Sequence, residues 1–207
     1  LIRYKGELFA RFSLPVALGR EPRPAEAAAV AAAFERVADA LEDAPLRLAH
    51  RDFQSQNVQV RPAPGGGPAR LALLDVQGAL LAPPEYDAVC LLRDSYVELP
   101  DAEWRAHLEW LRPRLPDPPD ADTFLRRFDL LTLTRKGKDH ARFLYAARER
   151  GDARWLRHLP ATARALLRVE APVAALRRLR DTRDALGWSR ELWRRMAALG
   201  WAGAALP

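Results

Sequence analysis

Two short segments contain the residues whose types and spacing could do chemistry. Residues 50–57 (HRDFQSQN) place a carboxylate at Asp52 and an amide at Asn57, and residues 73–77 (LLDVQ) place the carboxylate of Asp75 after an apolar run. Mg²⁺ prefers oxygen ligands, usually one or two from the protein and the rest from phosphate and water. Asn57 and Asp75 are therefore candidate metal ligands, and Asp52 remains to accept a proton from an attacking hydroxyl.

Short strands must position both segments. A stretch rich in proline and glycine at residues 62–68 predicts a tight turn. Around it lie three runs typical of strands, at residues 46–49, 58–60 and 71–74. The pattern predicts a strand, a polar loop and then a β-hairpin, with Asn57 and Asp75 near the same end of the hairpin.

The rest of the chain has a helical pattern. Strong helix formers with apolar residues at helical spacing predict a helix over residues 24–43. Further helices are expected at residues 85–95, 101–112, 120–149, 152–169 and 172–180. Their spacing predicts that several aromatic and apolar side chains pack in the core, namely Trp104, Trp110, Phe124, Phe128 and Leu131. The predicted fold class is α+β, with one mostly helical domain over residues 1–180 and a helical tail over 181–207.

Composition limits the class of protein. No run of about 18 or more uncharged apolar residues occurs, so we expect no membrane-spanning segment. The net charge is +6 and the isoelectric point about 10.1, but the arginines are dispersed among acids. We therefore expect no nucleic-acid partner. Cys90, the single cysteine, lies in an apolar run, which predicts a buried thiol and suits a reducing compartment such as the cytoplasm.

The order H-R-D, four residues, then N resembles the catalytic loop of protein kinases, with Asp75 in the place of the aspartate of the DFG segment. No APE segment follows, and residues 82–87 (APPEYD) instead resemble an element of the aminoglycoside phosphotransferase superfamily. Within that superfamily the chain most resembles the bacterial anomeric kinases of N-acetylmuramate and N-acetylglucosamine, enzymes of cell-wall recycling. The similar segments are residues 50–60, 73–100 and 124–160.

The resemblance implies roles for particular residues. By it, Asp52 is the general base, Asn57 and Asp75 bind Mg²⁺, and His50 and Asp87 brace the catalytic loop. ATP and Mg²⁺ are the implied cofactors, and the implied acceptor is a small molecule, with an amino sugar expected. The implied architecture is the C-terminal, mostly helical lobe of a protein-kinase-like fold.

Each of these residues also has a structural alternative. Asp52 and Asn57 could cap turns, and Asp87 could be the N-cap of an apolar helix. Gln77 is a candidate substrate contact or a solvent-facing side chain. Arg135 lies in a run of charged residues that either contacts substrate or forms a charged helix face.

Four positions depart from the pattern of those sugar kinases, which is near HRDFHSRN and LDFQDA. Gln54 and Gln56 stand in place of a His and an Arg, and Val76 and Gly78 in place of a Phe and an Asp. These departures bear on the choice of sugar. Two further hypotheses stay open: transfer to another acceptor (an aminoglycoside, choline-like or homoserine-like compound), and a non-catalytic pseudokinase or binding module.

A complete enzyme of this kind also needs a lobe that grips ATP, with a lysine on a strand and a loop over the phosphates. Lys5 has no strand pattern around it. We therefore expect that the N-terminal lobe is absent from these residues and belongs to the same longer chain, and that the 207 residues alone do not turn over. Residues 181–207 resemble the opening helix of an acyl-CoA dehydrogenase through W-x-x-M-A-x-L-G-W at 193–201, or form a terminal helix packed on the lobe.

Overall fold

The structure is a computed structural model, and it describes residues 2–63, 65, 67–167 and 169. The chain divides into two compact units. One, here called the helical unit, comprises Leu1–Asp43 and Asp129–Pro207, and the other, the hairpin unit, comprises Ala44–Phe128. The helix predicted at 172–180 and the tail predicted at 181–207 lie outside the described residues.

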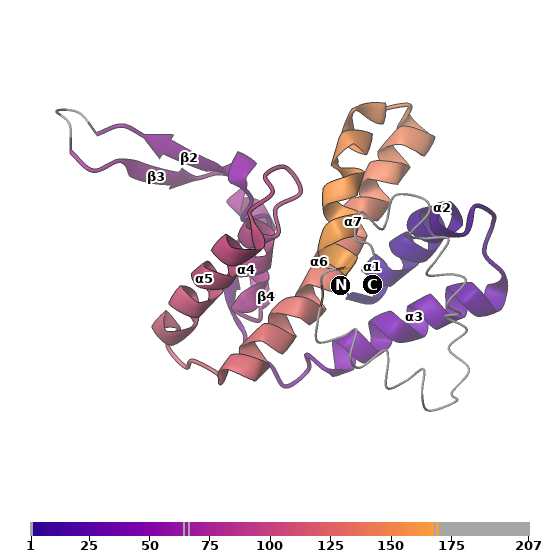
Figure 1. The fold of residues 1–207 in the computed structure, drawn as a ribbon, viewed down its shortest axis with the longest axis horizontal. Coiled ribbons are helices and arrows are strands. Elements are labelled where there is room, and N and C mark those ends of the chain that lie inside the picture. The colour runs from indigo at the N-terminus through magenta and orange to yellow at the C-terminus, as the bar shows by residue number, and fades with distance from the viewer. Residues whose placement is uncertain (1, 64, 66, 168, 170–207) are drawn as a thin grey trace. The chain divides into compact units, whose positions relative to one another are not determined.

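The strands described all belong to the hairpin unit and form two antiparallel pairs. They are β1 (Arg47–Ala49), β2 (Val58–Arg61), β3 (Arg70–Leu73) and β4 (Leu80–Ala82). Pairing of Val58 with Leu73 sets the register of β2 and β3, which run side by side in Figure 1, so the predicted hairpin is confirmed. The strand β4 was not predicted; it pairs with β1 and is too short for a periodic signal in the sequence.

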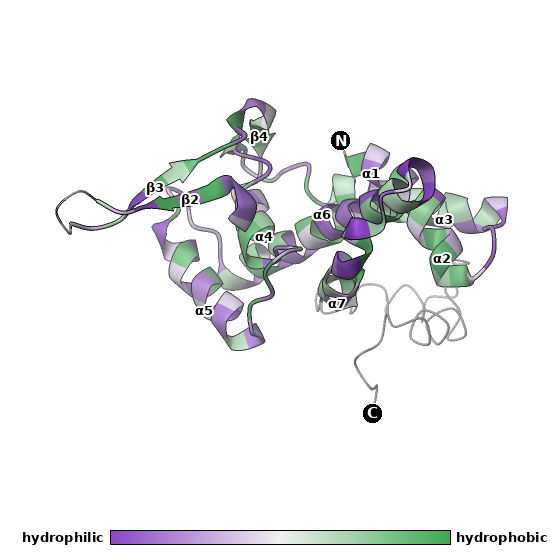
Figure 2. Ribbon diagram, turned by 90° about the horizontal axis from the view of Figure 1, so that it is seen from above, coloured by the Kyte–Doolittle hydropathy of each residue, from purple (hydrophilic) through white to green (hydrophobic). Residues whose placement is uncertain are grey.

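Hydrophobic side chains remain exposed on the hairpin. Val60 and Leu71 pair across it, and both are exposed to solvent. Figure 2 shows the hydrophobic colouring along β2 and β3.

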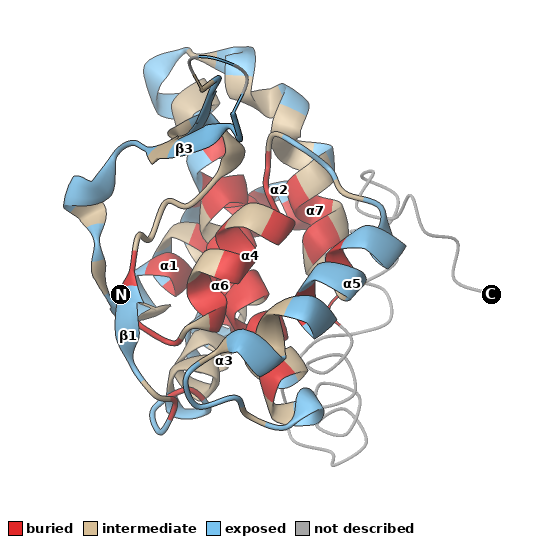
Figure 3. Cartoon of the chain, turned by 90° about the vertical axis from the view of Figure 1, so that its left-hand side faces the viewer, coloured by how far each residue is buried: buried red, intermediate tan, exposed pale blue. Residues whose placement is uncertain are grey.

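The helices of the hairpin unit are α4 (Glu85–Leu92), α5 (Asp101–Leu111), a 3₁₀ turn (Arg112–Arg114) and the beginning of α6 (Ala121–Arg150). Most of α4 is buried, as Figure 3 shows, because its sequence is apolar on nearly every side. Trp104 and Phe128 stack in the core with ring centroids 5.8 Å apart. The guanidinium of Arg93, just after α4, lies 3.8 Å from the centroid of the Trp104 ring.

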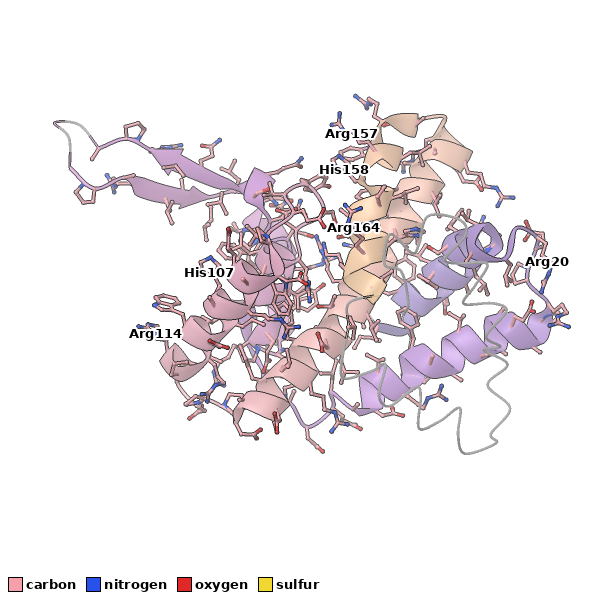
Figure 4. All side chains as sticks on the ribbon, in the orientation of Figure 1. Arg20, His107, Arg114, Arg157, His158 and Arg164 are labelled. Atoms are coloured by element: carbon pink, nitrogen blue, oxygen red, sulfur yellow. The ribbon has the colours of Figure 1, made fainter. Side chains whose placement is uncertain are left out.

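The prediction that Trp110 packs in the core is wrong. Trp104, Phe124, Phe128 and Leu131 are buried, but Trp110 is 58% exposed on α5. The guanidinium of Arg114 (labelled in Figure 4) covers one face of its ring at 4.1 Å from the centroid. Helical spacing alone does not distinguish a buried stripe from an exposed ring that a neighbouring arginine shields.

The helical unit begins with a helical segment that was not predicted from the sequence. It consists of α1 (Ile2–Leu8), a π-helical stretch (Phe9–Ser13) and α2 (Leu14–Leu18). Pro15 reads as a helix breaker, but it stands at the start of α2, where proline costs little. The unit also contains α3 (Pro24–Asp39), the remainder of α6, and α7 (Leu159–Leu167), which follows a 3₁₀ stretch (Ala153–His158).

Close packing in the helical unit depends on two glycines. A Cβ at Gly6 would lie 2.8 Å from Phe34, and one at Gly137 would lie 3.3 Å from Phe9. A larger residue at Gly6 would force Phe34 on α3 to shift, and one at Gly137 would require the Phe9 ring to move by a few tenths of an ångström. The apolar core around them consists of Phe9, Leu14, Ala17, Leu18, Val30 and Ala163, with Ala10, Phe34 and Leu166 packed against it.

The predicted α+β class is confirmed, since the described residues are mostly helical with two small antiparallel sheets. Within the described part of the chain, no helix combines the length and the apolar character needed to cross a membrane. Cys90 is buried, as predicted from its apolar neighbours.

Candidate active site

The loop between β1 and β2 is folded tightly onto itself. The backbone N–H of Gln54 donates to the carbonyl oxygen of Asp52 at 2.9 Å, and that of Asn57 donates to Gln54 at 2.9 Å. The side-chain Nδ2 of Asn57 donates to the same Asp52 carbonyl at 2.8 Å. This bond uses the amide nitrogen, so the Oδ1 of Asn57 is the atom that can accept a cation.

Asp75 lies beside this loop in a left-handed backbone conformation. Its φ is +63°, a region that aspartate and asparagine tolerate better than most residues. The N–H of Leu74 donates to the carbonyl oxygen of Asn57 at 2.9 Å, which brings the two candidate ligands to the same end of the hairpin. The side-chain amide of Gln77 donates to Oδ1 of Asp75.

The 3₁₀ turn after Asp75 (Val76–Gly78) approaches the candidate base. A Cβ at Gly78 would lie 3.7 Å from Oδ2 of Asp52. A side chain at this position would therefore meet the Asp52 carboxylate. The sequence departure at Gly78 thus changes the immediate surroundings of Asp52.

Asp87 holds the start of the loop. Its Oδ2 accepts from the N–H of His50 at 2.7 Å, and its Oδ1 accepts from the N–H of Arg51 at 3.0 Å. Arg51 has a φ of +75°, a conformation that costs a non-glycine residue about 1–3 kcal/mol. Each hydrogen bond to a carboxylate contributes about 1.5–3 kcal/mol, so Asp87 can offset that strain. The alternative role as N-cap is wrong, because α4 begins at Glu85, before Asp87.

His50 connects the loop to the strand that precedes Asp75. Its Nε2 lies 2.8 Å from the carbonyl oxygen of Leu74. A carbonyl oxygen only accepts hydrogen bonds, so Nε2 carries the proton in this contact. The imidazole thereby ties the loop of Asp52 to the segment of Asp75.

Two contacts with the loop were not foreseen from the sequence. The thiol of Cys90 donates to the carbonyl oxygen of Arg51 at 3.1 Å. Oδ2 of Asp94 accepts from the N–H of Ser55 at 2.7 Å. The only sequence signal for Asp94 was a carboxylate two residues after the apolar run at 88–92.

Arg135 belongs to the helical unit, whereas the other candidate residues belong to the hairpin unit. It is 3% exposed, and its Nε lies 3.3 Å from Oδ2 of Asp139, one turn away on α6. Although burial opposes ionisation, the charges of Arg135, Lys136 and Lys138 lower the pKa of Asp139. The alternative of a charged helix face holds only in part, because the charges lie along α6 but Arg135, Lys136 and Asp139 are buried.

The donor set in the hairpin unit fits a magnesium ion better than a metal held entirely by protein. In the part of the chain that the structure describes, no three His, Cys, Asp or Glu side chains gather as ligands. Asn57 and Asp75 offer one amide oxygen and one carboxylate, which suits an ion that takes its remaining ligands from phosphate and water.

Comparisons with known proteins agree with the kinase-like pattern. Residues 7–109 match the model of the phosphotransferase enzyme family. The N-acetylmuramate/N-acetylglucosamine kinase of Pseudomonas aeruginosa is 33% identical over 130 residues, which cover 60% of this chain and 36% of that protein. The protein of the same name from Pseudomonas putida is 30% identical over 170 residues, covering 77% of this chain and 47% of that protein. The chain thus spans less than half the length of these relatives. The resemblance of residues 181–207 to acyl-CoA dehydrogenases has no support in these comparisons.

Proposed function

We infer, from the phosphotransferase enzyme family domain at residues 7–109, that the chain contains the transfer site of a kinase acting on an alcohol group. The observation that supports this best is the convergence of three residues. Asn57 donates its side-chain amide to the carbonyl of Asp52, and Leu74 bonds to the backbone of Asn57, which brings Asp75 alongside. These are the residue types that phosphoryl transfer requires, in the order and local structure of a kinase catalytic loop.

Asp52 is the proposed general base. Its carboxylate would accept the proton of the acceptor hydroxyl and orient the oxygen toward the phosphorus. The backbone bonds of Gln54 and Asn57, and the Asp87 bonds to His50 and Arg51, hold this residue in place. Such fixed alignment supplies much of the rate in a transfer that needs little covalent chemistry.

Asn57 and Asp75 are the proposed magnesium ligands, through Oδ1 and the carboxylate respectively. When bound, Mg²⁺ would neutralise negative charge on the phosphate oxygens of ATP. Gln77 holds the Asp75 carboxylate and is also a candidate acceptor contact. Arg135 remains a weaker candidate for acceptor binding, because it is buried and paired with Asp139.

We further propose that the chain corresponds to the C-terminal lobe of a kinase-like fold. None of the described strands contains a lysine, and Lys5 is buried on α1. The lysine that pairs with ATP phosphates in kinases would then belong to a further part of a longer protein. On this proposal the 207 residues alone turn over poorly, and the full-length gene product is the active form.

An amino sugar is the proposed acceptor, phosphorylated at its anomeric hydroxyl in cell-wall recycling. The support is the printed activity of the two relatives, at 33% and 30% identity. An aminoglycoside or another small alcohol is the competing acceptor, since residues beside the base differ from the sugar-kinase pattern at Gln54, Gln56 and Gly78.

The test uses the full-length gene product with ATP and Mg²⁺. N-acetylmuramate, N-acetylglucosamine and kanamycin are offered separately, and the phosphorylated product is identified by mass spectrometry and ³¹P NMR. We expect a sugar 1-phosphate. Phosphorylation of kanamycin alone would reject the amino-sugar proposal, and no transfer to any acceptor would favour a pseudokinase.

A further inference from the structure

Side chains of α4 and of the residues that follow it make several hydrogen bonds to the backbone of the catalytic loop. Asp87 and Cys90 are spaced at i and i+3 on α4, which places them on the same side of that helix, and Asp94 follows two residues after its end. Asp87 accepts from the loop at His50 and Arg51, Cys90 donates to Arg51, and Asp94 accepts from Ser55. The first two contacts hold the beginning of the loop, and Asp94 alone of the three holds its middle.

The two oxygens of Asp94 have different partners. Oδ2 accepts from the N–H of Ser55 at 2.7 Å, and Oδ1 accepts from the N–H of Tyr96 at 2.8 Å. The side chain is only 7% exposed, so little water competes for these bonds. Arg93, the preceding residue, is packed against Trp104 in the core, which fixes this end of α4.

Ser55 lies between the candidate base and the candidate metal ligand. On one side Gln54 bonds back to Asp52, and on the other Asn57 bonds back to Gln54. Fixing the Ser55 amide therefore fixes the span that joins Asp52 to Asn57.

We propose that Asp94 is a positioning residue of the transfer reaction, which sets the placement of Asn57 relative to Asp52 through Ser55. This rests on the proposed function of Asp52 and Asn57. Loss of Asp94 leaves the base and the ligand chemically intact but lets the span between them move. A displacement of about 1 Å at a reacting centre can cost about 100-fold in rate.

The choice of variant distinguishes this role from ordinary packing. Asp94→Asn keeps the size of the side chain but offers only one accepting oxygen, with a donating nitrogen opposite the second N–H. If Asp94 only filled space, asparagine would be an adequate replacement. If it positions the loop through both oxygens, Asp94→Asn should behave like Asp94→Ala.

Asp120→Asn is the matched control. Asp120 also accepts two hydrogen bonds on separate oxygens, from the N–H of Thr123 at 2.8 Å and from its hydroxyl at 2.7 Å. Both donors are groups of Thr123, at the start of α6, and neither belongs to the catalytic loop. Loss of these bonds should therefore lower stability without changing transfer by the folded protein.

Two measurements test the proposal. In the full-length gene product, kcat per folded molecule should fall about 10- to 100-fold in Asp94→Asn and stay within about twofold of wild type in Asp120→Asn, since a hydrogen bond to a charged group is worth about 1.5–3 kcal/mol. In the ¹⁵N-labelled 207-residue chain, titration with Mn²⁺ should broaden the Asn57 side-chain amide at several-fold higher concentration in Asp94→Asn than in wild type.

The two readouts separate the inference from the function on which it rests. Wild-type kcat in Asp94→Asn would overturn the inference while leaving the kinase proposal standing. If the wild type transfers phosphate to no acceptor, the Mn²⁺ titration decides alone: an unchanged midpoint in Asp94→Asn rejects the positioning role, and a several-fold shift supports it.

Discussion

The side-chain amide of Asn57 donates to the backbone carbonyl of Asp52 at 2.8 Å, so the proposed metal ligand is bonded to the residue proposed as the base. That bond orients the amide, because its nitrogen is committed to the loop and its oxygen is left for a cation. The positions of the two residues are therefore coupled. A change that moves Asn57 is expected to move Asp52 as well.

Asp75 offers a test that separates charge from backbone strain. Asp75→Asn retains a residue that tolerates the left-handed φ of +63°, and its amide oxygen can still accept from Gln77. We expect stability near that of wild type and a roughly tenfold or greater weakening of Mg²⁺ activation, because ligand charge governs affinity for hard cations.

Asp75→Ala should show the same loss of Mg²⁺ activation together with about 1–2 kcal/mol lower stability, since alanine does not favour the left-handed region. Urea denaturation and the Mg²⁺ dependence of the transfer rate measure the two effects. Equal stability of the two variants would argue against the strain assigned to Asp75.

The buried ion pairs of α6 predict a stability effect. Oδ2 of Asp139 lies 3.3 Å from Arg135 and 3.2 Å from Lys136. Asp139→Asn removes the charge that compensates these buried cations, and breaking such a group costs about 3–5 kcal/mol. A urea midpoint unchanged from wild type would be inconsistent with the pairing.

Arg135→Gln distinguishes the two roles considered for that residue. We expect lower stability with an unchanged KM for the acceptor, because the side chain is buried and paired within its own helix. A raised KM with unchanged stability would instead identify Arg135 as an acceptor contact.

Because of His140, we expect the free energy of unfolding to decrease at acid pH. Burial lowers the pKa of this imidazole to about 4, and its Nδ1 lies 2.8 Å from the Ser13 hydroxyl. Between pH 6.5 and 4 the unfolded chain binds a proton that the folded chain does not, so this contribution to stability is lost as pH falls through that window. We expect about 2 kcal/mol loss between pH 7.5 and 5.0.

The control is His140→Asn, whose amide oxygen can accept from the Ser13 hydroxyl without titrating. Urea denaturation at pH 7.5 and 5.0 should show a smaller loss of stability in this variant than in wild type. Parallel losses in the two proteins would show that His140 is not the source.

Because of Glu85, we expect a contribution to the free energy of unfolding with the opposite pH dependence. Burial raises the pKa of its carboxyl, although Arg127 at 3.8 Å opposes the shift. The folded chain holds this proton more tightly than the unfolded chain, so the stabilising contribution is present below about pH 4.3 and is lost as pH rises through the raised pKa. The stability of Glu85→Gln relative to wild type should therefore increase from pH 4 to pH 7, as measured by urea denaturation. A difference that does not change with pH would contradict the burial of a titrating carboxyl.

Local pattern was sufficient to predict the loop and the hairpin. The spacing from His50 to Asn57 and the alternation at 58–60 and 71–74 depend on neighbours in sequence, and the structure pairs β2 with β3 accordingly. The roles of Asp52, Asn57 and Asp75 in transfer stay predictions.

Contacts between distant residues were beyond the reach of pattern. Asp94 and Cys90 each meet the loop across 39 residues of sequence, and no periodicity reports such a contact. The charges from Arg135 to Asp139 read as a solvated face, because sequence does not reveal when a helix buries its ion pairs.

The most direct test of the central proposal is the transfer rate of the Asp52→Asn variant of the full-length gene product, with ATP, Mg²⁺ and N-acetylmuramate or N-acetylglucosamine. Asparagine keeps the shape of the side chain and the backbone carbonyl that accepts from Asn57, but it cannot accept the hydroxyl proton. We predict that kcat falls about 10²- to 10⁴-fold with little change in the KM for the sugar. A variant that transfers phosphate at the wild-type rate would show that Asp52 is not the base.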